Sequence, residues 1–348
     1  MSFLENAWYL AAWQDELKNG ELFHRTILNE PVVLYRREKG SVAAIGGRCP
    51  HRFAPLYEGK LKGDIVECPY HGLQFDSSGA CIHNPHGNGF IPKTAKIRSY
   101  PVVEKHRAIW IWMGDPDAAH ESGVPDYSFM TTTPDTAIIT GYLPTAANYE
   151  LLVDNIMDLS HADYLHAGSL GTGGEIGRTK PEIRVSGNDV CCSWWLANAP
   201  ASPALAMCLP DPSAPADSWL EVTWSPPGNM KLRVGTTPAG KPREYGIDSN
   251  SLHIMTPESE TATHYFFANT RDFRVDDEAF TNQIREIITT AFRDEDKPMI
   301  EAQQRSMGTT DMWSLNPVIL SVDAGPVRVR RMLEKLIEAE NKPQVRDT

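Results

Sequence analysis

Short apolar runs separated by turn residues follow one another through the first 116 residues. The clearest are Pro31-Val32-Val33-Leu34-Tyr35, Val42-Ala43-Ala44-Ile45, Leu73-Gln74-Phe75 and Ile109-Trp110-Ile111-Trp112-Met113. Runs of this length, rich in β-branched and aromatic residues and bounded by Gly, Pro and Asp, are typical of β-strands. The pattern predicts a small all-β domain over residues 1–116.

The pattern changes after Asp115. Residues 117–140 are rich in Asp, Pro, Ser and Thr with little periodicity, which predicts a linker. Residues 141–348 then combine helical and strand patterns, and we expect a helix over about 148–166, strands over about 183–273 and a helix over about 278–304. A Pro-rich run over residues 199–215 predicts a long loop, which is either a cover over a site or a disordered segment, and we favour the cover. The chain of 348 residues is therefore expected to form two domains of the α+β class.

Two short stretches each carry one cysteine and one histidine. They are Cys49-Pro50-His51-Arg52 and Cys68-Pro69-Tyr70-His71-Gly72, and sixteen residues lie between His51 and Cys68. A Rieske [2Fe-2S] centre needs this set of donors, because two Cys hold one iron and two His hold the other. The prolines and the glycine favour tight turns that can direct the four side chains to a common centre. We predict that Cys49, His51, Cys68 and His71 bind such a cluster and that the chain carries electrons.

Two simpler interpretations of these residues are less favourable. A zinc finger usually takes two Cys from one knuckle and two His from a helix, whereas here each loop supplies one of each. A disulfide between Cys49 and Cys68 would leave both histidines unexplained.

Composition limits the possible partners. The formal net charge of −12 argues against nucleic acid, and an anionic substrate would need a locally positive site. No stretch approaches the roughly 18 apolar residues of a membrane span, and the N-terminus lacks the pattern of an export signal. The remaining cysteines show no disulfide spacing, so we expect free thiols in a reducing cytoplasm; they are Cys81, Cys191, Cys192 and Cys208.

A second group of metal-binding residues lies in the helical segment Asn155-Ile156-Met157-Asp158-Leu159-Ser160-His161-Ala162-Asp163-Tyr164-Leu165-His166. At 100° per residue, Asp158 and His161 share a face, but His161 and His166 diverge by about 140° on an ideal helix. The helix must therefore bend or end between the two histidines if both bind one atom. Two imidazoles and one carboxylate with the other positions open form the facial triad of non-haem Fe(II) oxygenases.

The carboxylate of such a triad has to come from elsewhere, and Asp294-Glu295-Asp296 lies in the predicted helix near the C-terminus. Two apolar stripes cross this segment, one that includes Asp296 and one that includes Glu295, and Pro298 is expected to bend the helix. The periodicity alone does not choose between the two acids.

The chain resembles the oxygenase components of the Rieske non-haem iron aromatic oxygenases, in the single-subunit group of vanillate and dicamba O-demethylases and toluenesulfonate methyl-monooxygenase. The resemblance covers nearly the whole length. Besides the two cluster loops, it rests on Asn6-Ala7-Trp8-Tyr9, His83-Asn84-Pro85-His86-Gly87, Asn148-Tyr149, Asp154-Asn155-Ile156-Met157-Asp158, Thr256-Pro257-Glu258 and Glu295-Asp296-Lys297.

The resemblance implies a β-rich Rieske domain followed by a catalytic domain in which a curved antiparallel sheet wraps around a long helix, the helix-grip arrangement. It selects Asp296 as the third iron ligand beside His161 and His166. It also implies an NAD(P)H-dependent reductase or ferredoxin as electron donor, and a head-to-tail homotrimer. In such a trimer the Asp158 carboxylate would bridge His71 of one subunit and His161 of the next, while Asn155 would lie near the iron.

The resemblance further implies an enzyme that uses O2 to demethylate an aryl methyl ether acid. His253 resembles the substrate-binding histidine of the demethylases, and Lys231 and Arg233 are further candidates for an anionic group. Candidates for apolar pocket walls are Val153, Trp194, Trp195, Trp224, Phe266 and Phe267. Hydroxylation of a ring or methyl group stays open as an alternative reaction. A Rieske electron carrier without substrate is the alternative class, but it would need only the first domain.

Overall fold

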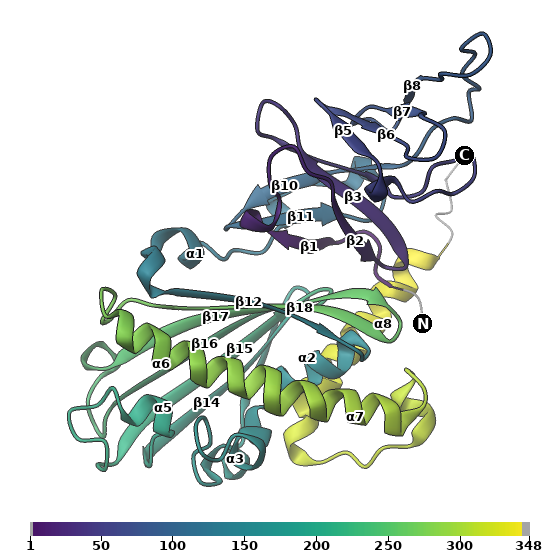
Figure 1. The fold of residues 1–348 in the computed structure, drawn as a ribbon. Helices are drawn as coiled ribbons and strands as arrows, with labels where there is room; N and C mark the ends of the chain where they lie inside the picture. Colours follow the sequence, from purple (N-terminus) through teal and green to yellow (C-terminus); the bar gives the residue numbers. More distant parts are fainter. Residues whose placement is uncertain (1–2, 343–348) are drawn as a thin grey trace. The chain divides into compact units, whose positions relative to one another are not determined.

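The apolar runs of the N-terminal part form the strands of three small antiparallel sheets in the computed structural model, which describes residues 3–342 (Figure 1). The orders are β1-β11-β10, β2-β3-β4-β9 and β5-β6-β7-β8. The strands are β1 (Trp8–Trp13), β2 (Phe23–Ile27), β3 (Glu30–Arg36), β4 (Val42–Gly46), β5 (Lys60–Lys62), β6 (Ile65–Glu67), β7 (Gln74–Phe75), β8 (Cys81–His83), β9 (Ser99–Tyr100), β10 (Val102–Lys105) and β11 (Ala108–Trp112). Short 3-10 helices are η1 (Gln14–Glu16), η2 (Leu56–Glu58), η3 (Pro116–Ala118) and η4 (Glu121–Gly123).

The division between the two compact units of the chain falls after Val124. This position lies inside the expected linker of residues 117–140. That stretch is not free of regular structure, however, because it contains α1 (Phe129–Thr132), η5 (Asp135–Ala137) and the first residues of β12 (Ile138–Thr145). The sheet of the second unit therefore begins slightly before Gly141, where the second domain was expected to start.

A seven-stranded antiparallel sheet is the centre of the second unit, in the order β12-β18-β17-β16-β15-β14-β13. The further strands are β13 (Glu182–Ser186), β14 (Asp189–Ala199), β15 (Ala216–Ser225), β16 (Asn229–Pro238), β17 (Ile247–Ser259) and β18 (Ala262–Arg271). The α-helices are α2 (Tyr149–Met157), α3 (Ala162–Leu165), α4 (Glu175–Arg178), α5 (Pro203–Ala206), α6 (Glu278–Thr289), α7 (Lys297–Met307) and α8 (Ala324–Asn341). Short 3-10 helices are η6 (Leu159–His161), η7 (Arg243–Tyr245), η9 (Met312–Leu315) and η10 (Ser321–Asp323). The expected fold class, an all-β domain followed by a domain with a large antiparallel sheet and helices, is confirmed.

A long helical segment crosses one face of this sheet (Figure 1). Asp277 caps its start by accepting a hydrogen bond from the Phe280 backbone N–H at 2.9 Å. Apolar residues at helical spacing, among them Phe280, Ile284 and Ile288, face a pocket that the strands also line. The segment is not one regular helix, because the π-helix η8 (Thr290–Asp296) separates α6 from α7. Pro298, which was expected to bend the helix, follows η8 directly within the same continuous helical run. Its missing N–H and its ring act on the turn that contains η8, so the irregularity lies where a proline disturbs a helix.

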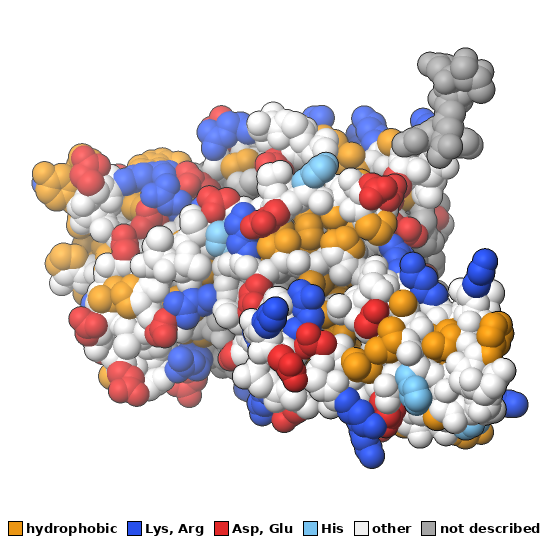
Figure 2. All heavy atoms as spheres, turned by 90° about the horizontal axis from the view of Figure 1, so that it is seen from above, with side chains coloured by type: hydrophobic (Ala, Val, Ile, Leu, Met, Phe, Trp, Pro, Cys, Tyr) orange, Lys and Arg blue, Asp and Glu red, His pale blue; other side chains and the backbone are white. Residues whose placement is uncertain are grey.

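The predicted helix over residues 148–166 is broken into three pieces. α2 ends at Met157, Asp158 has an extended backbone, and η6 and α3 follow. A buried ion pair between α8 and α2 fixes the first piece: Arg330 donates to Asp154 at 2.6 Å and to Glu150 at 2.8 Å. Among residues 3–342, no helix combines the length and apolar composition needed to cross a membrane. On the face drawn in Figure 2, acidic and basic side chains are intermixed.

Candidate metal centres and substrate pocket

The two Cys-His loops have the same backbone hydrogen bonds. In the first, the Cys49 N–H donates to the Ala54 carbonyl at 2.9 Å and the Phe53 N–H donates to the Cys49 carbonyl at 2.8 Å. In the second, the Cys68 N–H donates to the Leu73 carbonyl and the Gly72 N–H to the Cys68 carbonyl. Phe53 and Gly72 occupy equivalent positions, and both have positive φ, 57° and 71°. Only glycine adopts this conformation without steric cost, so Phe53 is held in a strained one.

The four predicted cluster ligands approach one another at the ends of these loops. The His51 and His71 rings lie 4.5 Å apart, while the two cysteines are buried beside each other in the core cluster of this domain. Burial raises the pKa of Cys49 to about 11, and the neighbouring Cys68 thiol adds to the effect. Two buried sulfurs and two outward imidazoles are the donors that a [2Fe-2S] cluster of the Rieske type requires, so the residues fit this group.

Replacing His71 with Cys is expected to preserve a cluster but lower its reduction potential by more than about 100 mV, since all-Cys clusters have lower potentials than His2Cys2 clusters. A redox titration followed by visible absorption measures this shift. The exposed His83 of the same domain provides the control, because His83→Cys should leave the potential unchanged. An unchanged potential in His71→Cys would mean that His71 is not a ligand.

Three further donors meet in the second unit. Ligand atoms of His161, His166 and Asp296 all lie within 4.8 Å of one another. Asp296 Oδ1 is 3.1 Å from His166 Nε2 and 3.5 Å from His161 Nε2. The two histidines flank α3, and the regular helix ends at Leu165, which lets two residues five positions apart face the same point. Two imidazoles and a carboxylate with open positions fit a non-haem Fe(II) ion.

The other ring nitrogen of each histidine is held by a hydrogen-bond acceptor. His161 Nδ1 donates to the Asp158 backbone carbonyl at 2.6 Å, and His166 Nδ1 donates to Glu295 Oε2 at 2.5 Å. These hydrogen bonds leave each Nε2 without a proton and able to bind a metal ion. Acceptors of this kind commonly fix the orientation of histidines that bind metals. Burial lowers the pKa of His166, but the hydrogen bonds and charges of Asp296 and Glu295 outweigh burial and leave that pKa raised.

Both acids that the sequence left open are therefore at the site, in different positions. Asp296 faces the two Nε2 atoms, whereas Glu295 contacts the opposite side of the His166 ring. The π-helix η8, which ends at Asp296, changes the angle between successive residues, so that neighbouring acids approach one histidine from two sides. Asn155 Nδ2 donates to Asp296 Oδ1 at 3.1 Å and so holds the carboxylate in place.

Asp158 was expected to contact His161 through its side-chain carboxylate, but in the structure the contact is made by its backbone carbonyl. The premise of a shared helical face is wrong, because α2 ends before Asp158. The Asp158 carboxylate instead caps η6 by accepting a hydrogen bond from the Ser160 N–H at 3.0 Å, and only its backbone carbonyl contacts His161. The carboxylate nevertheless lines an outer groove together with His161.

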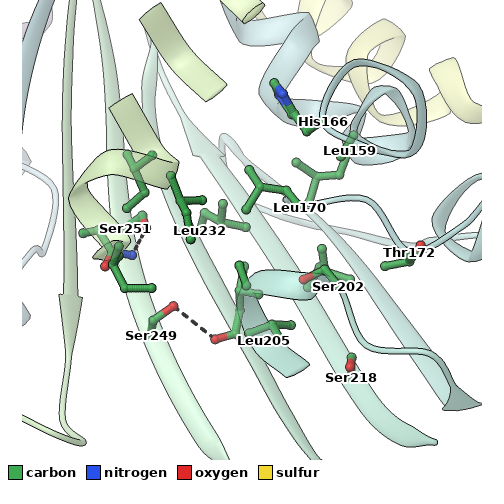
Figure 3. A pocket seen from close by; sticks show the side chains of 18 of the residues that line it. Leu159, His166, Leu170, Thr172, Ser202, Leu205, Ser218, Leu232, Ser249 and Ser251 are labelled. Atoms are coloured by element: carbon green, nitrogen blue, oxygen red, sulfur yellow. Dashed lines mark hydrogen bonds between the residues drawn. The ribbon is translucent and has the colours of Figure 1, made fainter. Parts of the chain in front are cut away.

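A pocket with a volume of about 170 Å³ opens beside the three donors (Figure 3). His161, His166 and Asp296 line it together with apolar residues from the sheet and from α6. The Pro-rich segment contributes Ser202 and Leu205, which agrees with its expected role as a cover.

Only one of the three expected anion-binding residues lines the pocket. His253 does, whereas Lys231 and Arg233 do not, because the alternate residues Leu232 and Val234 of β16 face the pocket. Arg233 forms an ion pair with Asp248, and Lys231 lies over the Phe129 ring. The prediction of the apolar wall residues was also wrong. This pocket is lined by none of the residues that were predicted for its walls, namely Val153, Trp194, Trp195, Trp224, Phe266 and Phe267.

His253 is a buried, neutral hydrogen-bonding group. Its Nδ1 lies 2.7 Å from the Tyr265 hydroxyl, and its Nε2 has no hydrogen-bond partner among the described residues. Burial lowers the pKa of His253 to about 4, so the ring has no charge at neutral pH. Asn269 and Arg271 of β18 also line the pocket and were not predicted. Alternation gives no signal for them, because Asn269, Thr270 and Arg271 are three consecutive polar residues at the end of an otherwise aromatic strand.

A domain with a Rieske-type donor set, joined to a domain with a facial triad beside a pocket, is the architecture of a Rieske non-haem iron oxygenase. Residues 7–101 match the Rieske [2Fe-2S] domain, and residues 145–339 match the vanillate O-demethylase oxygenase C-terminal domain. The chain belongs to the vanillate O-demethylase family of Rieske oxygenases. A second domain of this kind excludes the alternative of a simple Rieske electron carrier.

Individual relatives resemble the chain over almost its full length. The dicamba O-demethylase oxygenase component of Stenotrophomonas maltophilia is 40% identical over 340 residues, which cover 98% of this chain and 99% of that protein. The vanillate O-demethylase oxygenase subunit of a Pseudomonas species is 34% identical and covers 98% of this chain and 96% of that protein. The crystal structure of dicamba monooxygenase bound to 3,6-dichlorosalicylic acid superimposes with a TM-score of 0.91 at 39% identity, over 98% of this chain and 99% of that one.

Proposed function

We propose that the protein is the terminal oxygenase of a multicomponent system and removes the methyl group of an aryl methyl ether acid as formaldehyde. The observation that carries this proposal is the pocket, whose lining combines the three metal-ligating side chains with mostly apolar residues. A small aromatic molecule bound there has its methyl group beside His161, His166 and Asp296. The O-demethylase relatives support the same reaction.

The reaction balances with O2 and two electrons. Two electrons and two protons reduce one oxygen atom to water, and the other oxygen atom is inserted into a C–H bond of the methyl group. The resulting hemiacetal then breaks its C–O bond and releases formaldehyde and a phenol. A reductase or ferredoxin that takes electrons from NAD(P)H supplies them, as the relatives named as oxygenase components suggest.

In this proposal each candidate side chain has a stated task. Cys49, His51, Cys68 and His71 hold the [2Fe-2S] cluster, and His161, His166 and Asp296 hold Fe²⁺. When bound, the two groups supply one-electron transfer and the activation of O2. Asn155 and Glu295 fix the ligands through the hydrogen bonds described above. The Nε2 of His253, which has no hydrogen-bond partner among residues 3–342, forms a hydrogen bond with the substrate.

We further propose that the protein assembles head to tail as a homotrimer, so that the cluster loops of one subunit face the iron site of the next. Exposed hydrophobic side chains on both surfaces support this arrangement. Phe53 (73% exposed) and Tyr70 (63% exposed) lie in the two cluster loops. Val318 (84% exposed) and Ile319 line the outer groove that contains Asp158 and His161. Hydrophobic surfaces of this kind are usually covered by a partner.

A panel of aromatic acids tests the proposed reaction. With reductase, NADH and O2, 4-methoxybenzoate and vanillate are expected to yield one formaldehyde and one phenol per turnover. The matched compound 4-methylbenzoate lacks the ether oxygen, so it cannot release formaldehyde. Formaldehyde and phenol are measured by derivatisation and chromatography. Conversion of 4-methylbenzoate to the benzylic alcohol, with both methoxy acids left unchanged, would instead favour the alternative of methyl hydroxylation.

A further inference from the structure

The pocket contains a buried cation that the proposed reaction does not use. Arg271 is the last residue of β18 and is only 3% exposed. Its Nη2 donates to the Thr281 hydroxyl at 2.5 Å and to the Arg274 carbonyl at 3.0 Å. Its Nε and Nη1 have no hydrogen-bond partner within the described part of the chain. The nearby Asp277 carboxylate is engaged by Arg274 at 2.5 Å.

A buried guanidinium with unused donors is unusual. Arginine keeps its proton in proteins, and buried charges are normally paired because desolvation of an unpaired charge is costly. Burial lowers the pKa of Arg271, although the charge of Asp277 opposes this effect. The Phe280 ring, 5.2 Å from the guanidinium carbon, stabilises the cation in part but leaves both donors without an acceptor. An oxyanion in the pocket would provide the missing acceptor.

The position of Arg271 defines which part of a substrate it can reach. On the strands β17 and β18, His253 pairs with Phe267, Ser251 with Asn269, and Ser249 with Arg271. Alternate residues face the same side, so His253, Ser251 and Ser249 line the pocket in succession. In Figure 3, His166 lies at one end of the pocket, while Ser249 and Ser251 lie toward the other.

The polar residues of these two strands therefore form a track that leads away from the metal-ligating side chains. Four residues of strand separate His253 from Ser249, which corresponds to about 13 Å between their Cα atoms. In the middle of the track, Asn269 Nδ2 donates to the Ser251 hydroxyl at 2.9 Å. Arg271 lies at the far end, where the other lining residues, such as Phe273, Phe280 and Ile284, are apolar.

We propose that Arg271 binds an anionic group, a carboxylate or sulfonate, at the end of the substrate remote from the oxidised methyl group. The preferred substrates are then elongated aromatic anions in which the anionic group lies farther from the methyl ether than in a methoxybenzoate. Lys231 and Arg233 cannot serve this purpose because they lie on the other face of β16, and His253 provides a hydrogen bond without a charge. The inference rests on the proposed function, since it deepens the substrate class of the same pocket.

A series of acids of increasing length tests the inference. The probes are 4-methoxybenzoate, 3-(4-methoxyphenyl)propanoate and 4-(4-methoxyphenyl)butanoate, each beside its uncharged carboxamide. Calorimetry on the holoenzyme without O2 gives the dissociation constants, and formaldehyde release gives kcat and KM. We expect the longer acids to bind about 10- to 100-fold more tightly than their amides, the size of effect that a charge-assisted hydrogen bond provides. For 4-methoxybenzoate, whose carboxylate is too close to the methyl ether to reach Arg271, the difference in affinity between the acid and its amide should be smaller.

Variants identify the residue responsible. Arg271→Met should abolish the preference for the acids, and it should raise KM for the acids by a larger factor than KM for the amides. Arg271→Lys should retain part of the preference, which a merely structural role of the arginine would not explain. Lys231→Met removes a cation from the face of β16 that points away from the pocket. It should leave the ratio of the dissociation constants of each acid and its amide unchanged.

The outcomes separate this inference from the proposed reaction. Equal binding of acids and amides by the unchanged protein, or an acid preference that persists in Arg271→Met, would overturn the role of Arg271 even if formaldehyde is released. The unchanged protein provides this test even if a variant fails to fold. An acid preference that depends on Arg271, without formaldehyde from any probe, would support the role of Arg271 and overturn the proposed demethylation.

Discussion

Replacing Asp296 with alanine is expected to remove the mononuclear iron and abolish oxygenase turnover while the cluster stays intact. Asp296 Oδ1 is the carboxylate oxygen that lies within 3.5 Å of both His161 Nε2 and His166 Nε2. Without it, the two imidazoles alone have to hold the ion. The affinity for iron should therefore fall further than it does when only an outer partner of a metal ligand is removed, which costs roughly 10- to 100-fold. Iron content per chain, measured beside the visible absorption of the cluster, tests the expectation.

The run Asp294-Glu295-Asp296 supplies its own controls. Asp294 is exposed and bound to Arg293 at 2.7 Å, so Asp294→Ala should retain full iron and activity. Glu295→Gln should weaken iron binding by about 10- to 100-fold without abolishing it, because Glu295 accepts the hydrogen bond from His166 Nδ1. Loss of iron in Glu295→Ala, together with retention of iron in Asp296→Ala, would show that the assignment of the carboxylate ligand is wrong.

The difference between the two metal centres explains what the sequence could predict. Each cluster loop brings a cysteine and a histidine together within a few residues, and turn residues fix the local geometry, so the pattern is visible without knowledge of the fold. The choice between Glu295 and Asp296 depends on the phase of a helix over several turns. The π-helix η8 changes that phase, and no rule of helical periodicity anticipates it. The resemblance to a family selected Asp296, whereas the periodicity did not.

The substrate pocket was predicted less well for a related reason. Strand periodicity shows that Lys231 and Arg233 share one face and Leu232 and Val234 the other, but it does not show which face meets α6. That choice is made by long-range packing. Arg271 was missed because it ends a strand, where an arginine is ordinarily exposed to solvent, whereas here Thr281 and Phe280 of α6 cover it.

Replacing Asp158 with asparagine is expected to abolish turnover although both metal centres remain. The proposed trimer gives the Asp158 carboxylate the task of accepting a hydrogen bond from His71 of the neighbouring subunit. Asparagine is as good a helix-capping residue as aspartate, so the contact with the Ser160 N–H should persist. The backbone carbonyl that orients His161 is also unchanged. The substitution thus removes the negative charge and little else.

Single-turnover kinetics on prereduced protein distinguish the possible roles of this charge. We expect Asp158→Asn to bind both metals, to accept electrons from the reductase at the normal rate and to form almost no product from prereduced protein. Asp158→Ala, which also loses the cap, should in addition lose about 1 kcal/mol of stability, and so separates the structural effect from the electrostatic one. Normal product formation by prereduced Asp158→Asn would mean that the carboxylate only caps η6, and that electrons reach the catalytic domain by a route that does not depend on its charge.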